Sequence, residues 1–249
     1  MHDTERLITA RKQVDMGYDN ENAQGIISVE PLVLDIETTA HSLAERWLEP
    51  VNAPAHYKDA EKIAAAKREK AAAQLDRAAL DGAVNRIVAI GWGSTRMEPV
   101  VVLCKDEDQE ARALEQFWAL AQTGSGTRRL IQFNGVGFDL PIMLTRSSLL
   151  GLKAPLLNLS KYEKNPNTDL MLLLSYYGAM PTHGLQFWCS RYGIADLIPD
   201  PAPAVAAISG ADIPRLVAEH TDAAWSLIQG HCEHDIRQTV ALAKRLGVI

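Results

Sequence analysis

A short apolar run that ends in two acidic residues is the feature that most constrains this chain. Residues 31–39 read Pro-Leu-Val-Leu-Asp-Ile-Glu-Thr-Thr, which is typical of a buried strand. Residues two apart in a strand point to the same face, so Asp35 and Glu37 project together while Ile36 faces the core. Two buried carboxylates repel each other and lose hydration, and we therefore expect a cation between them. Oxygen ligands favour Mg²⁺ or Mn²⁺ over zinc.

The chain has 249 residues, enough for one large domain. We expect an N-terminal arm at 1–28 and a single domain at 29–249 with a helical insertion at 40–85. The net charge of −6 argues against a protein that coats nucleic acid, but it allows an enzyme that grips a nucleic-acid end. We find neither a signal peptide nor a membrane-spanning run. The three scattered cysteines favour a reducing compartment, so we expect a cytoplasmic protein without membrane contact.

The rest of the pattern predicts strands first and helices later. Two β-branched runs around a Gly-Ser-Thr-Arg turn predict an antiparallel hairpin over 86–92 and 99–104. A further strand is expected at 130–133, and a proline- and alanine-rich connector at 199–207. Helical spacing predicts helices at about 60–80, 107–122, 139–150, 170–177, 185–192, 213–219 and 223–246. This order predicts an α/β fold in which a mixed β-sheet is flanked by helices.

A second acidic motif, Phe-Asn-Gly-Val-Gly-Phe-Asp, occupies residues 133–139. Gly135 and Gly137 let the chain leave the strand tightly and let a ligand approach the backbone. Asp139 then stands near the start of a helix, where a carboxylate is favoured and could face Asp35 and Glu37. The alternative is that Asp139 serves only as a helix cap.

A third motif lies in the last predicted helix. Residues four apart share a helical face, so His231 and Asp235 look in one direction. A histidine in such a helix is often only a satisfied surface or core group. A zinc site made from His231, Cys232, His234 and Cys189 is a weaker alternative, because no pair of these residues has the usual knuckle spacing.

Taken together over about residues 30–247, the three motifs resemble the DEDD superfamily of 3′–5′ exonucleases, in particular predicted exonucleases similar to the proofreading domain of B-family DNA polymerases. The resemblance implies a ribonuclease-H-like fold and two Mg²⁺ or Mn²⁺ ions. Asp35, Glu37 and Asp235 would hold one ion, and Asp35 and Asp139 would reach the other. The implied activity is release of nucleoside monophosphates from 3′ ends, mainly of single-stranded DNA, by a two-metal-ion mechanism.

One position departs from the family pattern. One branch of these exonucleases has tyrosine four residues before the final aspartate, and another has histidine five residues before it. Here His231 stands four residues before Asp235, and Gly230 stands five before. We expect His231 to orient or deprotonate the attacking water, since an imidazole suits general base work. His234 points about 100° away from Asp235 and is the weaker candidate.

Four further residues are candidates for contact with the substrate. Thr38 could donate a hydrogen bond to the terminal nucleotide, and Asn134 could make a similar polar contact. Trp47 could stack on a base at the rim, and Phe138 could act as a wedge, although a core position is the commoner role for such a phenylalanine. We expect the helix at 60–80 to be a solvated cover.

Other prominent side chains have simpler interpretations. Asp169 precedes an apolar helix and is expected to cap it, with a supporting role at the site as the alternative. Trp118, Phe187 and Trp188 fall on apolar helical faces and are expected to pack.

Competing functions are an RNA 3′–5′ exonuclease and a catalytically weakened module that binds nucleic-acid ends. No polymerase domain is expected after Gly247, so a role in replication or repair would require a polymerase partner in trans.

Overall fold

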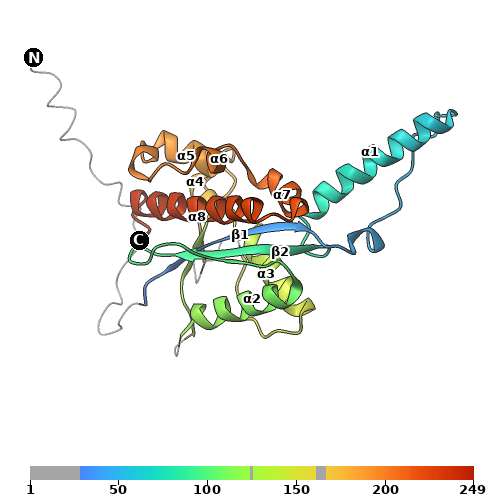
Figure 1. Cartoon of the computed structure of the whole chain (residues 1–249). Helices are drawn as coiled ribbons and strands as arrows, with labels where there is room; N and C mark the ends of the chain where they lie inside the picture. Colours follow the sequence, from blue (N-terminus) through green and yellow to red (C-terminus); the bar gives the residue numbers. More distant parts are fainter. Residues whose placement is uncertain (1–28, 124–125, 161–166) are drawn as a thin grey trace, which may run out of the picture.

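A computed structural model describes residues 29–123, 126–160 and 167–249, and the predicted arm at 1–28 lies outside these ranges. A five-stranded sheet has the order β3-β2-β1-β6-β7 (Figure 1). Strands β1 and β2 are antiparallel, as are β2 and β3, whereas β6 and β7 run parallel to β1. The five strands are β1 (Leu32–Ala40), β2 (Asn85–Gly93), β3 (Val100–Leu103), β6 (Leu130–Gln132) and β7 (Asn167–Asp169). The predicted mixed sheet and the predicted hairpin are confirmed.

Helices cover both faces of this sheet (Figure 1). One face packs against α2 (Glu107–Ala121) and α3 (Asp139–Leu149). The other packs against the long α8 (Asp222–Arg245), which is joined on its outer side by shorter helices. The remaining elements are η1 (Ala44–Arg46), α1 (Ala60–Ala78), β4 (Gln122–Thr123), β5 (Gly126–Thr127), α4 (Leu170–Leu174), α5 (Leu185–Arg191), η2 (Ala195–Leu197), α6 (Pro203–Ala206), η3 (Gly210–Asp212) and α7 (Ile213–Glu219). No helix in the described ranges combines the length and apolarity that crossing a membrane requires.

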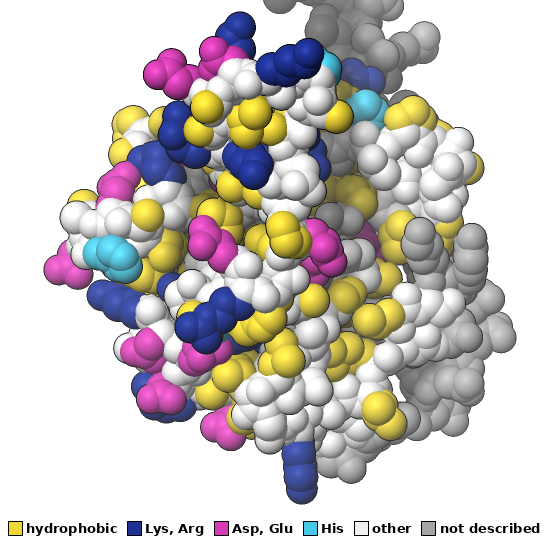
Figure 2. Space-filling view, turned by 90° about the vertical axis from the view of Figure 1, so that its right-hand side faces the viewer, with side chains coloured by type: hydrophobic (Ala, Val, Ile, Leu, Met, Phe, Trp, Pro, Cys, Tyr) yellow, Lys and Arg dark blue, Asp and Glu magenta, His cyan; other side chains and the backbone are white. Residues whose placement is uncertain are grey.

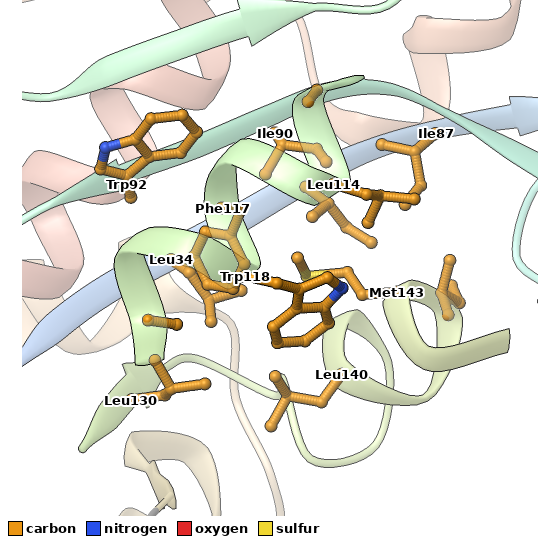
Figure 3. Packing of buried hydrophobic residues seen from close by; sticks show 14 of the residues in the cluster. Leu34, Ile87, Ile90, Trp92, Leu114, Phe117, Trp118, Leu130, Leu140 and Met143 are labelled. Carbon is orange, nitrogen blue, oxygen red and sulfur yellow. The ribbon is translucent and has the colours of Figure 1, made fainter. Parts of the chain in front are cut away.

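Strand β1 separates two hydrophobic cores because its side chains alternate between the faces of the sheet. Leu34 and Ile36 pack with Phe117 and Trp118 of α2 in the first core, which Figure 3 shows from close by. Val33 belongs to the second core, on the side of α8. Asp35 and Glu37 follow Val33 at intervals of two residues, and they therefore project on the α8 side, while Ile36 faces the first core as predicted.

Helix α1 projects away from the body of the molecule (Figure 1). The Asp59 side chain accepts a hydrogen bond from the backbone N–H of Lys62 and so caps the helix, as predicted. Most of its residues are exposed. Figure 2, viewed from the side on which α1 projects, shows basic and acidic side chains interspersed on the surface rather than a patch of one sign. The helix is thus largely solvated, as expected.

The later part of the chain differs from the predictions in four places. The helix predicted at 170–177 ends at Leu174, where Tyr176 and Tyr177 adopt positive φ angles and turn the chain. The predicted connector contains the short α6, and the three-residue strand β7 was not predicted. The prediction that Phe187 packs inside is wrong, because this side chain is 42% exposed and stacks on His183.

Candidate active site

The first acidic pair lies where β1 meets an irregularity in β2. Asp35 pairs with Gly91 and Glu37 with Ala89, but Thr38 pairs with Ile87, so β2 carries one extra residue at this point. Such a β-bulge bends the strand locally. The buried Glu110 of α2 accepts a hydrogen bond from the Ile87 N–H at 3.0 Å. The bulge therefore ends the regular part of β1 directly after the two carboxylates.

Asp139 reaches the same strand from the start of α3. Strand β6 pairs with β1 only at Leu32 and Val33, which leaves the later part of that edge of β1 without a strand partner. One Asp139 carboxylate oxygen fills part of this gap by accepting a hydrogen bond from the Ile36 N–H at 3.1 Å. Only 4% of Asp139 is exposed. The second motif is thus anchored to the backbone between Asp35 and Glu37.

The third motif comes from α8, which crosses β1. His231 Nε2 lies 3.7 Å from a Glu37 carboxylate oxygen and 3.9 Å from an Asp235 carboxylate oxygen. The Cys232 thiol lies 3.8 Å from the carbonyl oxygen of Asp35. Three distant parts of the sequence therefore meet at one place, with His231 between the first and the third motif.

Burial raises the pKa values of all four carboxyl groups, and repulsion by neighbouring acids adds to the increase at Asp35, Glu37 and Asp139. Loss of hydration is the largest cause at each of them. The pKa of Asp35 is raised well above its usual value, further increased by the charges of Glu37, Asp139 and Asp235. The pKa of Asp139 rises to about 7 even though the Ile36 N–H lowers it. At Asp235, His231 and His234 oppose the increase in pKa. A cation near these groups would relieve the repulsion.

The donor set fits a hard divalent cation, because it consists of buried carboxylate oxygens. In the described residues, however, no three His, Cys, Asp or Glu side chains already form a group that could hold a metal ion. The carboxylates would therefore have to close around an ion as it binds. The proposed zinc set does not converge, since the Cys189 thiol faces the Gln238 carbonyl and His234 contacts the Gln238 side chain.

Asp169, at the end of β7, organises the second motif. Its carboxylate accepts hydrogen bonds from the N–H groups of Asn134 and Val136 at 3.0 and 3.1 Å. It also accepts from Met171 and Leu172 and so caps α4, as predicted. Asn134 has a positive φ of 66°, a conformation that asparagine tolerates better than most residues. This supporting role was only an alternative in the sequence, where the apolar run after Asp169 indicated the cap.

Gly135 follows Asn134 where the chain leaves β6. A Cβ atom at this position would overlap the Gln132 side chain, so only glycine permits the close approach. Gln132 is fully buried, and both polar atoms of its side chain lack a hydrogen-bond partner within the part of the chain that the structure describes.

The candidate substrate residues lie in different settings. The Thr38 hydroxyl donates a hydrogen bond to the Ala79 carbonyl at 2.6 Å, and only 6% of the residue is exposed. The Thr38 side chain therefore ties β1 to the end of the insertion at Ala79, and we do not retain Thr38 as a substrate contact. Trp47 is 55% exposed, with its ring 5.0 Å from that of His41. Phe138 is half-buried against the first core, and it also lines a cavity of about 390 Å³ beside Gly137.

The chain is similar to known proteins in sequence and in fold. A family model described as "Predicted 3'-5' exonuclease related to the exonuclease domain of PolB" matches residues 79–248, more than half of the chain. The match includes the second and third motifs, whereas Asp35 and Glu37 precede it. No curated protein matches the chain.

A solved structure is similar in fold. It is the family B DNA polymerase from the hyperthermophilic archaeon Pyrobaculum calidifontis, with 14% sequence identity and a TM-score of 0.57. The similarity covers 88% of this chain but only 24% of the polymerase chain. The mixed five-stranded sheet flanked by helices is consistent with the predicted ribonuclease-H-like fold.

Proposed function

Because the chain belongs to the family of predicted 3′–5′ exonucleases related to the exonuclease domain of PolB, we propose that it hydrolyses the last phosphodiester bond at the 3′ end of single-stranded DNA. Water adds to the phosphorus, the bond to the 3′ oxygen breaks, and a nucleoside 5′-monophosphate leaves. The position of His231 between Glu37 and Asp235 is the observation that carries this proposal.

We assign metal binding to Asp35, Glu37, Asp139 and Asp235, whose raised pKa values mean that their charged forms are disfavoured without a cation nearby. Two Mg²⁺ or Mn²⁺ ions, when bound, supply water activation and charge stabilisation at the departing oxygen. Asp139 accepts a hydrogen bond from the N–H of Ile36, the residue next to Asp35, and its charge acts on Asp35, which suits these two carboxylates to a shared ion. Asp169 acts indirectly, by fixing the turn that leads to Asp139.

His231 is the proposed group that orients the water and takes its proton. The two carboxylates within 4 Å of its Nε2 atom would stabilise the imidazolium that forms. Trp47, exposed at the start of the insertion, is the proposed stacking residue, with Asn134 and Phe138 beside the site. We place this activity next to a polymerase acting in trans, during replication or repair in the cytoplasm. The three free, buried cysteines suit a reducing compartment.

The test is digestion of a 5′-labelled DNA oligomer with MgCl₂ or MnCl₂. The wild type should release mononucleotides, and Asp35→Asn and Asp235→Asn should each reduce the rate by at least about a thousandfold. Asp76→Asn, on the exposed α1, is the matched control and should retain the full rate. An unchanged rate in either site variant would reject the assignment.

Two further comparisons separate the competing functions. An RNA oligomer of the same sequence identifies the preferred sugar, and faster digestion of RNA would replace DNA in the proposal. If the wild type is inert and His231→Tyr creates activity, the protein is a weakened end-binding module. If His231→Tyr lowers an existing rate, His231 is the working group.

A further inference from the structure

A second cavity lies on the opposite side of α8 from the acidic site. It has a volume of about 840 Å³ and lies between the β2–β3 turn, the segment around η2 and the last three turns of α8. Arg237, Val240 and Lys244 line it from α8. They follow Asp235 by two, five and nine residues, which corresponds to rotations of about 200°, 140° and 180° around the helix axis. The side chains of Arg237, Val240 and Lys244 therefore point away from that of Asp235.

The rim of this cavity is basic, although the whole chain carries a net charge of −6. Arg96, Arg237, Lys244 and Arg245 contribute to the rim, against a single acidic lining residue, Glu98. Within the described ranges, Arg96, Lys244 and Arg245 form no ion pair, whereas Arg237 lies 3.6 Å from a carboxylate oxygen of Glu98 and 3.6 Å from one of Glu233. The charge of Arg96 also helps to lower the pKa of the nearby Glu30. Lys244 and Arg245 in the last helical turn also suit the helix dipole, but this does not account for Arg96 or Arg237.

Arg96 is presented on a fixed turn. The buried Ser94 accepts hydrogen bonds at its hydroxyl oxygen from the N–H groups of Arg96 and Met97, at 3.2 and 3.1 Å. The Ser94 N–H donates to the Met97 carbonyl at 3.1 Å. The backbone below the Arg96 side chain is thus ordered before any partner binds, which reduces the entropy lost on binding.

The floor of the cavity is aliphatic. Ile194, Ile198 and Val240 belong to or pack against the second core, and Leu197 at the edge is 76% exposed. None of the described lining residues is aromatic. Proteins that hold single-stranded nucleic acid typically stack its bases on aromatic rings, and such a surface is missing from this lining. The volume lies within the roughly 300–1,000 Å³ of ordinary ligand pockets.

We propose that this cavity binds an acidic peptide segment of a partner protein, with carboxylates on the basic rim and aliphatic side chains on the floor. The combination of a basic rim, where Lys244 and Arg245 have no ion-pair partner in the described ranges, and an aliphatic floor without aromatic rings fits such a segment better than it fits nucleic acid. The proposal does not depend on the nuclease assignment, because the two sites occupy different faces of α8.

The test measures fluorescence anisotropy of the full chain with a fluorescein-labelled hexapeptide of alternating aspartate and leucine. Two control peptides replace aspartate by asparagine or leucine by serine. Each control peptide should bind about tenfold more weakly than the probe. Arg96→Glu combined with Lys244→Glu should weaken probe binding about tenfold, and Leu197→Ser should weaken it to a smaller extent. Lys67→Glu combined with Arg68→Glu, an equal charge change on exposed α1, should leave binding unchanged.

Three results would overturn the proposal. The first is the absence of saturable binding by the wild type, and the second is equal binding by the cavity variant and the α1 variant. The third is displacement of the probe by oligodeoxythymidylate at a lower concentration than by unlabelled peptide, which would make the cavity a nucleic-acid site.

Discussion

Replacing Asp139 by asparagine should stabilise the metal-free protein at high pH, even though it removes a proposed catalytic residue. The carboxyl group is 4% exposed and lies among other acids, and burial raises its pKa from an ordinary 3.8 to about 7. The asparagine carbonyl can still accept the hydrogen bond from the Ile36 N–H. The substitution therefore removes a charge and leaves the local backbone contact in place.

The size of the effect follows from the pKa. Each unit of difference between the folded and unfolded states corresponds to 1.36 kcal/mol, so the charged Asp139 costs the metal-free protein about 4 kcal/mol above pH 7. The folded state holds the proton more tightly than the unfolded chain does, and stability therefore falls as pH rises from about 4 to about 7. Asp139→Asn should gain about 4 kcal/mol over the wild type at pH 8 and less than half of that at pH 5.

Urea unfolding in EDTA at pH 5, 6, 7 and 8 measures this difference. Asp76→Asn on exposed α1 is the control and should stay within about 0.5 kcal/mol of the wild type at every pH. Adding MgCl₂ at pH 8 should stabilise the wild type more than Asp139→Asn, because the ion compensates the charge that the variant lacks. A loss of stability in Asp139→Asn at pH 8, or a gain independent of pH, would refute the reasoning.

Three further variants test the supports of the site. Asp169→Ala leaves four N–H groups without their acceptor and should lower the free energy of unfolding in urea by about 3 kcal/mol. The variant should also have a lower nuclease rate, and an unchanged rate would show that Asp169 does not support the site. Gly91→Ala places a methyl group against side chains of α8 and should lower the stability measured by thermal unfolding by about 1–3 kcal/mol. Gly210→Ala, where the methyl group faces open space, should lower this stability far less. Arg146→Met leaves the charge of the buried Glu110 without its ion-pair partner and should lower the free energy of unfolding in urea by about 3–5 kcal/mol. Adding Glu110→Gln should restore much of this stability, and the absence of any recovery would show that the two residues do not act as a unit.

Local spacing was enough to predict parts of the site. The period of two in a strand places Asp35 and Glu37 on one face and Ile36 on the other, and the structure agrees for Ile36. The spacing of four in a helix places His231 and Asp235 together, as their 3.9 Å contact shows. Both inferences involve residues within one element, where backbone geometry determines the neighbours.

Contacts between distant elements could not be predicted in this way. The bond from the Ile36 N–H to Asp139 depends on where β6 ends, and the Thr38 bond to the Ala79 carbonyl depends on the path of the insertion. Strand β7 has only three residues, too few to show a period, so the sequence did not indicate that Asp169 stands beside the second motif. The exposed position of Phe187 likewise depends on how α5 sits on α8.

The extra residue in β2 lies opposite the end of the acidic pair, between the partners of Glu37 and Thr38. Glu37 pairs with Ala89 and Thr38 with Ile87, which leaves Val88 as the residue that β1 does not match. Val88 and Ala89 both pack on the side of α7 and α8, whereas Ile87 and Ile90 belong to the first core, so the extra residue lets two consecutive side chains of β2 face the same way. Deleting Val88 would keep the pairings of Glu37 with Ala89 and of Thr38 with Ile87, but it would remove the local bend of β2 opposite the end of the acidic pair.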